Sequence, residues 1–268
     1  MVLSGSRRAA AIAIAAALII GLAACAAPAP ARPSDLDRRL AELDRMVADG
    51  LADSASRAAG ALRAEGIDHP QLAWAEARLA FARSEWAAAA QTCERLIALA
   101  PGWVEPRILL ARAYQGDGRA AAAASVFADI DRLAPQSPWG PYGQAAHAIG
   151  QQRWADAVRL AEAAIARAPA FAPALRLRAM LAQRDGDPAA EERWLLRLTD
   201  HDPADPAAWW RLGELAAAAG RQLDADAHRD RAWRLDPDPD RARRLADEAQ
   251  TAGDAPTAAR WRRRAEAP

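Results

Sequence analysis

The sequence PAAWWRLGELAAAAGRQLDADAHRDRAWRLDPDP, at residues 206–239, carries the pattern that decides the fold. It consists of two segments separated by Gly220 and ended by Pro237. The ending proline recurs every 34 residues, at Pro101, Pro135, Pro169, Pro203 and Pro237. A fixed repeat of this length indicates a solenoid of helix pairs, in which each repeat buries its apolar face against its neighbours.

Two positions of the repeat are small, which favours close helix packing. When the proline is numbered 32, position 8 reads Ala77, Ala111, Ala145, Ala179 and Gly213, and position 20 reads Ala89, Ala123, Ala157, Glu191 and Ala225. Small side chains let two helices approach closely while larger neighbours fill the gaps. Because Asp187-Pro188 can start a helix early, we expect a one-residue shift that puts Ala190, rather than Glu191, in the small position. Glycines 118, 186 and 220 predict turns with positive φ.

The repeat at residues 206–239 also contains Trp209, Leu212 and Gly213, which form a W-x2-L-G signature. With the five prolines, this signature closely resembles the tetratricopeptide repeat family over most of residues 36–266. The resemblance implies an all-α solenoid of about seven antiparallel helix pairs in a right-handed superhelix. The expected repeats are 36–69, 70–103, 104–137, 138–171, 172–205, 206–239 and 240–266. Ser34 and Asp37 predict an N-terminal helix cap at the start of the solenoid, which we expect at residues 35–268.

Residues 1–24 have the pattern of a lipoprotein signal peptide. Arg7 and Arg8 precede an apolar run that is too short for a comfortable membrane span. The run ends in Leu-Ala-Ala-Cys25, which resembles a bacterial lipobox and implies lipidation of Cys25. Ordinary signal cleavage near the same place and an uncleaved anchor are the alternatives. Residues 25–34 predict a lipidated Pro/Ala tether.

The same resemblance suggests where the protein resides. The residue after Cys25 is alanine rather than aspartate, which by resemblance to lipoprotein sorting favours an outer-membrane lipoprotein facing the periplasm. The inner membrane stays an alternative. The expected partners are therefore the membrane, through the lipid, and another protein.

Composition and motifs argue against several functional classes. The 35 basic and 35 acidic residues produce no global field that would attract nucleic acid. The four histidines lack metal-ligand spacing, and no catalytic motif is found, so we expect no enzyme activity, metal, cofactor or small-molecule substrate. After lipidation Cys93 is the one remaining cysteine, and we expect it to be buried and inert.

The expected binding site is the inner groove, which the first helices line in this family. The groove residues that the resemblance implies are large, aromatic or basic: Trp74, Arg78, Phe81, Ile108, Arg112, Trp139, Tyr142, Ile149, Arg176, Met180 and Trp210. Such residues suit an extended or helical peptide. For Trp74, Tyr142 and Trp210, packing against a neighbouring repeat or cover by the N-terminal segment is the alternative. Trp86, Trp154 and Trp209 are expected in the core, and the arginine-rich last pair is expected to be a solvated face.

These features together predict a lipid-anchored periplasmic scaffold. Its architecture resembles lipoproteins that assist type IV or Tad pilus and secretion assembly. One alternative is a regulator of cell-wall synthesis or polysaccharide-export enzymes. Another is an enzyme with an unrecognised site.

Overall fold

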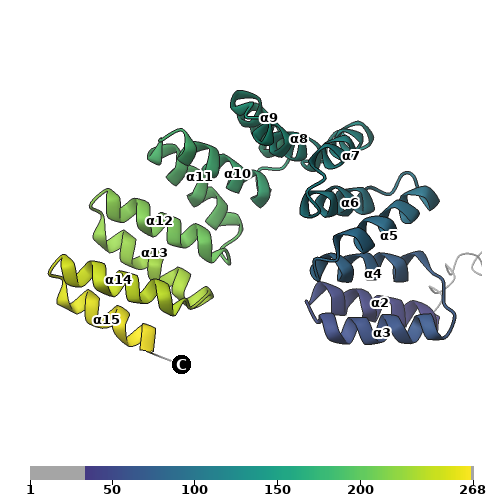
Figure 1. The fold of residues 1–268 in the computed structure, drawn as a ribbon, viewed down its shortest axis with the longest axis horizontal. Helices are drawn as coiled ribbons and strands as arrows, with labels where there is room; N and C mark the ends of the chain where they lie inside the picture. Colours follow the sequence, from purple (N-terminus) through teal and green to yellow (C-terminus); the bar gives the residue numbers. More distant parts are fainter. Residues whose placement is uncertain (1–33, 267–268) are drawn as a thin grey trace, which may run out of the picture. The chain divides into compact units, whose positions relative to one another are not determined.

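The computed structural model describes residues 34–266, and helices joined by short turns account for this part, with no strand among those residues. The first helices of the pairs are α2 (Asp35–Ala48), α4 (Pro70–Ala82), α6 (Val104–Gly116), α8 (Trp139–Gly150), α10 (Ala172–Arg184), α12 (Pro206–Ala218) and α14 (Pro239–Thr251) (Figure 1). The second helices are α3 (Ala52–Ala64), α5 (Trp86–Leu99), α7 (Ala120–Leu133), α9 (Trp154–Arg167), α11 (Pro188–His201), α13 (Gln222–Leu235) and α15 (Ala255–Glu266). The predicted all-α architecture is confirmed. Within residues 34–266, no helix combines the length and apolar character needed to cross a membrane.

The chain divides into two compact units, one that ends at Ile67 and one that begins at Asp68. The first unit contains α2 and α3. Helix α2 begins at the predicted cap, where the Ser34 hydroxyl accepts from the Asp37 N–H at 3.0 Å and the Asp37 carboxylate accepts from the Ser34 N–H at 2.9 Å. This reciprocal pair satisfies two backbone donors that the helix itself leaves free.

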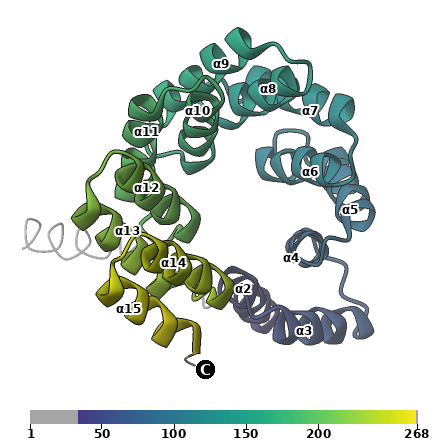
Figure 2. The ribbon, with the colours of Figure 1, turned by 60° about the vertical axis from the view of Figure 1, so that its left-hand side comes forward.

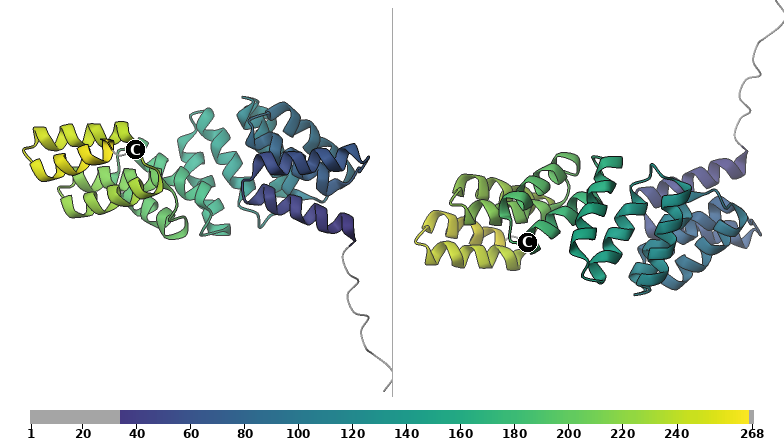
Figure 3. Two further views of the ribbon diagram at one scale, coloured as in Figure 1. Left: turned by 90° about the horizontal axis from the view of Figure 1, so that it is seen from below. Right: turned by 90° about the horizontal axis from the view of Figure 1, so that it is seen from above.

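The second unit contains α4 to α15. Successive helices from α4 to α13 pack against one another along the chain, and so do α14 and α15. Within this unit the first helices α4, α6, α8 and α10 lie toward the inner side, with α5, α7, α9 and α11 outside them (Figure 2). Figure 3 shows the successive pairs stacked one after another. This stacking places the first helices of neighbouring repeats side by side, where they form one surface.

The small positions of the repeat are buried as the sequence predicts. Ala77, Ala111 and Ala145 at position 8 have no exposed surface, and the alanines at position 20 are at most 2% exposed. Larger side chains such as Phe127 fill the space between these crossings, since Phe127 is fully buried in the cluster that joins α4 to α7. Burial of such side chains provides most of the stability of the helix pairs.

The predicted one-residue shift around Ala190 is wrong. Helix α11 begins at Pro188, which is 34 residues after the start of α9 at Trp154 and 34 before the start of α13 at Gln222. The helix therefore keeps the register of its neighbours, and Glu191 itself occupies the small position, where it is buried. The carboxylate is accommodated because an arginine of the next repeat pairs with it, a contact that the repeat pattern does not contain.

The turn inside each pair uses a left-handed backbone at position 15. Gly118, Gly186 and Gly220 have φ values of 73°, 69° and 74°, as the sequence predicts. The same position holds Ser84, at φ 61°, and Gln152, at φ 58°. A residue with a Cβ atom is strained in this region by about 1–2 kcal/mol, whereas glycine is not.

We therefore expect Ser84→Gly and Gln152→Gly each to raise the free energy of unfolding by about 0.5–1 kcal/mol, because the relief of strain exceeds the added entropy of unfolded glycine. Urea denaturation followed by circular dichroism measures the change. Gly118→Ala is the opposite control and is expected to lose about 1 kcal/mol. If the glycine variants were less stable than the parent protein, the strain at Ser84 and Gln152 would be negligible.

Candidate functional site

The predicted groove residues all lie on first helices, from α4 to α12. Most are partly exposed, which separates them from the buried residues of the same helices. The surface that they form divides into an aromatic part over α4, α6 and α8 and a pocket over α10 and α12.

The aromatic part centres on three rings that meet at the boundary of α8 and α10. Trp139 lies 5.7 Å from Tyr142 and 4.9 Å from Phe171, and Tyr142 lies 5.6 Å from Phe171, measured between ring centroids. All three pairs are edge-to-face, the geometry that aromatic quadrupoles favour. Phe171 ends the turn before α10 and was not among the predicted residues. Phe171 immediately precedes α10, just as Trp103 immediately precedes α6. This recurrence of an aromatic residue at one position of the repeat is the sequence signal that could have identified it.

Arg112 of α6 connects this cluster to α4. Its guanidinium carbon lies 4.6 Å from the ring centroid of Phe81 and 5.6 Å from that of Trp139, which are cation–π distances. Within residues 34–266, Arg112 is exposed and forms no ion pair. The guanidinium therefore remains available to a carboxylate of another molecule.

Tyr142 is half-buried beside these charges. Burial raises the pKa of Tyr142, and the guanidiniums of Arg112 and Arg176 act in the opposite direction. The phenol consequently stays protonated near neutral pH and can donate a hydrogen bond. We call Phe81, Arg112, Trp139, Tyr142 and Phe171 the aromatic face.

A second ring contact joins α4 to the turn before α6. Trp74 packs 5.6 Å from Trp103, and the Arg78 guanidinium carbon lies 6.0 Å from the Trp74 ring centroid. Ile108 and Ile149 are only partly exposed and pack against the cores beside them. These residues border the aromatic face and also support the repeats beneath it.

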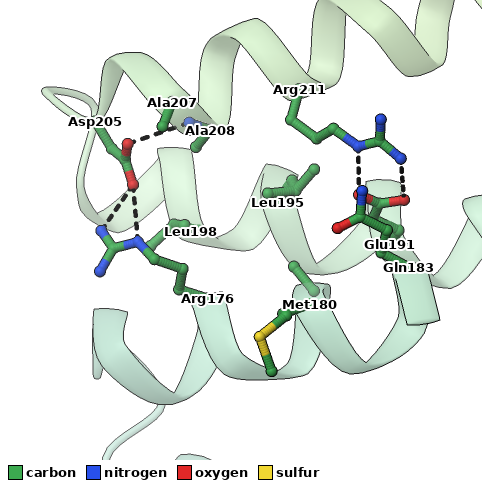
Figure 4. Close-up of a pocket in the computed structure, with 11 residues that line it drawn as sticks. Arg176, Met180, Gln183, Glu191, Leu195, Leu198, Asp205, Ala207, Ala208 and Arg211 are labelled. Carbon is green, nitrogen blue, oxygen red and sulfur yellow. Dashed lines mark hydrogen bonds and ion pairs between the residues drawn. The ribbon is translucent and has the colours of Figure 1, made fainter.

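Arg176 and Met180 line a pocket of about 150 Å³ between α10, α11 and α12. The pocket has an apolar lining with an ion pair at each end (Figure 4). At one end Arg176 Nη2 lies 2.7 Å from Asp205 Oδ2, and Asp205 also accepts from the Ala208 N–H at 3.1 Å as the N-cap of α12. Asp205 is only 7% exposed, whereas the Arg176 side chain is 53% exposed.

At the other end of the pocket, Arg211 pairs with Glu191, the glutamate that occupies a small position of the repeat. Arg211 of α12 donates through Nε and Nη2 to the two oxygens of Glu191, at 2.6 and 2.9 Å, and through Nη1 to Glu214 at 2.8 Å. The Glu191 side chain is 4% exposed and that of Arg211 is 33% exposed. The Glu191 carboxylate raises the pKa of Arg211 above its ordinary value. A glutamate in a position that is otherwise small was the sequence signal for this contact.

Trp210 does not reach the groove surface. It is 6% exposed and packs 5.9 Å from Trp261 of α15, with Arg241 of α14 over its ring at 4.9 Å. Trp210 therefore packs against the neighbouring repeat, which is the alternative that the sequence analysis left open. The partner-facing assignment of Trp210 is corrected accordingly.

The arginine-rich last pair is only partly a solvated face. Arg260 pairs with Asp226 at 2.8 Å and Arg264 with Asp230 at 2.6 Å, so both fasten α15 to α13. Trp261 between them is fully buried. The expectation of a solvated face is wrong for these residues, because aspartates of α13, in the preceding repeat, lie opposite them.

The three tryptophans expected in the core are half-buried and packed. Trp86 contacts Phe81 at 5.1 Å, Trp154 lies under Arg184, and Trp209 stacks on His228 at 5.5 Å. Cys93 is buried as predicted, and burial raises the pKa of its thiol to about 12, with a smaller contribution from the Glu94 carboxylate. A thiol with so high a pKa is a poor nucleophile at neutral pH.

Cys25, the predicted lipidation site, lies outside the described residues, as do the signal peptide and nearly all of the tether. Among residues 34–266, no group of three or more His, Cys, Asp or Glu side chains is placed to hold a metal ion.

No protein-family model matches the sequence, and no curated protein matches it either. Solved structures do resemble it. PilW, described as a widely conserved type IV pilus biogenesis factor, aligns with a TM-score of 0.58 and 13% identity over 76% of this chain and 96% of that chain. A tetratricopeptide repeat protein from Parabacteroides merdae aligns with a TM-score of 0.54 and 15% identity over 85% of this chain and 91% of that chain.

A larger assembly contains the same architecture. One chain of the APC/C hetero-tetramer Cut9–Hcn1 aligns with a TM-score of 0.66 and 12% identity, over 87% of this chain and 46% of that chain. Identities this low establish the fold alone. The 34-residue helix pairs, the buried small positions and these likenesses together show that the chain has the tetratricopeptide repeat fold.

Proposed function

We propose that the protein is a scaffold that holds another protein against the aromatic face of its first helices. The observation that supports this proposal is the combination of partly exposed rings and an exposed guanidinium that has no carboxylate of its own. Aromatic rings and arginine dominate the energetics of protein interfaces, because they bury a large area and bond directionally. Packing within residues 34–266 explains the rings in part, and it places the Arg112 guanidinium over two of them, but it pairs that guanidinium with no carboxylate.

The scaffold is further proposed to be a lipid-anchored protein of the bacterial envelope that faces the periplasm. The lipobox-like sequence ending at Cys25 supports the anchor, and the alanine that follows it supports the outer membrane. Two or more acyl chains would attach such a protein stably, at about 0.8 kcal/mol per buried methylene. A function as a scaffold fits this location, since it needs neither a cofactor nor a soluble substrate.

Assembly of a type IV or Tad-type pilus or secretion system is the proposed pathway. The likeness to PilW supports it, since nearly all of that chain aligns with this one. Because the likeness is one of fold, the choice depends equally on the predicted arrangement of signal, short tether and solenoid. Regulation of cell-wall synthesis or of polysaccharide export is the alternative that the same arrangement supports.

We expect a photo-reactive amino acid at position 142 to cross-link in living cells to one dominant envelope protein, because Tyr142 lies within the aromatic face. Mass spectrometry identifies the adduct. A pilus or secretin component supports the proposed pathway, and a peptidoglycan synthase, hydrolase or polysaccharide-export protein supports the alternative. Arg112→Gln, at an exposed position, is expected to reduce the adduct without disturbing the fold.

The control probe replaces Leu133, an exposed residue of the second helix α7. Adducts from Leu133 in the absence of adducts from position 142 would contradict the proposal, because binding would then use the outer helices. Circular dichroism of each variant verifies that the helices are intact.

A further inference from the structure

We propose that the pocket between α10, α11 and α12 receives one apolar side chain of a partner segment that carries basic residues on both sides of it. This inference rests on the proposed function, since it specifies what part of the groove binds. It depends on three properties of the pocket: its size, its lining and the charge at its two ends.

The size of the pocket fits one side chain. Its volume is about 150 Å³, whereas pockets that hold small molecules usually measure about 300–1,000 Å³. Interfaces commonly anchor on single large side chains that fill pockets of this kind. The occupant is therefore a side chain of the partner rather than a free ligand.

The lining of the pocket is apolar and already built. Leu195 and Leu198 of α11 lie between the two ion pairs, and Met180 of α10 lies across from them (Figure 4). The leucines are buried in the core of the repeats, while Met180 is 43% exposed. An apolar side chain that enters here gains burial on several sides, and the buried carboxylates of Glu191 and Asp205 already have arginine partners.

The charge at the first end of the pocket is negative. Arg176 pairs with Asp205 at 2.7 Å and also lies 3.8 Å from Asp202. The buried Asp205 carboxylate neutralises the guanidinium, so the more exposed Asp202 leaves this end with one net negative charge.

The second end repeats the arrangement. Arg211 is neutralised by the buried Glu191, and the exposed Glu214, at 2.8 Å, leaves one net negative charge. A partner with arginine or lysine on both sides of its apolar anchor complements the two ends. A partner with acidic flanks would face like charges at both.

Random peptides displayed on phage test this inference. The library is selected on the immobilised full-length protein, and the enriched peptides are synthesised and titrated by fluorescence anisotropy. Four variants are compared with the parent protein. Ala207→Phe blocks the pocket from an exposed lining position, Met180→Ala removes one wall, and Glu214→Gln removes the charge at one end. Leu196→Ala is the matched control, because Leu196 is 40% exposed on α11 and does not line the pocket.

We expect the enriched peptides to share one Leu, Ile, Met or Phe with Arg or Lys within a few residues on each side. Their affinity should fall about tenfold or more with Ala207→Phe and with Met180→Ala, in the range of a lost interface anchor. It should fall less with Glu214→Gln and stay unchanged with Leu196→Ala.

The inference would be overturned if the enriched peptides carried acidic residues beside the apolar one, or if they bound the Ala207→Phe variant as tightly as the parent protein. It would also be overturned if no enriched peptide depended on the pocket. The cross-link at position 142 distinguishes the two proposals, because it tests the groove without the pocket. A cross-link there together with an unused pocket leaves the proposed function standing and removes only this inference.

Discussion

Arg211→Ala is expected to lower the free energy of unfolding by about 3–5 kcal/mol, the usual cost of leaving a buried charge without its partner. Arg211 supplies both hydrogen bonds to the Glu191 carboxylate, whose side chain is 4% exposed. Without the guanidinium, that carboxylate must stay buried and unpaired or take up a proton. Either outcome weakens the contact between α11 and α12, which joins two repeats.

The reverse substitution is expected to be mild. Glu191→Ala leaves a guanidinium that is 33% exposed and still bonded to Glu214, so no buried charge remains. It also restores the residue that occupies this position in the other repeats, such as Ala157 and Ala225. We expect a loss below about 1 kcal/mol, and we expect the double variant Glu191→Ala/Arg211→Ala to be more stable than Arg211→Ala alone.

Urea denaturation followed by circular dichroism measures all three variants. Arg243→Ala is the surface control, because its pairing with Asp240 is exposed on both sides and such pairs contribute about 0–1 kcal/mol. Equal losses for Arg211→Ala and Glu191→Ala would contradict the prediction, since they would mean that the Glu191 carboxylate reaches water.

Gly143→Ala is expected to destabilise the protein by about 1–3 kcal/mol or more, through overpacking. A Cβ atom at this position of α8 would lie 1.9 to 2.3 Å from three carbons of the Phe127 ring, far inside contact distance. Phe127 is fully buried, so its ring can move only by displacing the core residues around it. The helices α7 and α8 would have to separate.

Gly150→Ala is the matched control on the same helix. Nothing lies within 4 Å of a Cβ atom there, so the substitution gains helix propensity, up to about 1 kcal/mol, without a clash. Opposite signs for the two alanines, measured from denaturation midpoints with unchanged m-values, would support the packing of Phe127 against α8. A Gly143→Ala variant as stable as the parent protein would contradict it.

The aromatic face was predictable in part. Phe81, Arg112, Trp139 and Tyr142 follow from the repeat register, because residues four and seven apart on a helix share one side. Phe171 was not predicted, since it lies in the turn before α10, outside the helical positions. Its contact with the other rings depends on how one repeat stacks on the next, which helix periodicity does not specify.

Trp210 and Glu191 are two positions at which the repeat register alone gave the wrong prediction. The register placed Trp210 with the groove residues, yet Trp261 and Arg241 of the last repeat cover it. From the repeat register we expected a one-residue shift that would remove Glu191 from the small position. The shift does not occur, and Arg211 of the next repeat pairs with the Glu191 carboxylate. In both cases the deciding partner lies on another repeat, at a position where residue types vary.

The sequence by itself determined the helix pairs, their 34-residue spacing, the buried small positions and the glycine turns. These features depend on interactions between residues close in the chain, so periodicity and backbone preference are enough to specify them. Only the tertiary structure decided which tryptophans are covered, where a buried carboxylate finds its guanidinium, and that a side-chain-sized pocket opens between α10 and α12. Those outcomes depend on side chains from different repeats meeting across an interface, where the free energy of each contact depends on the partner that stacking brings to it.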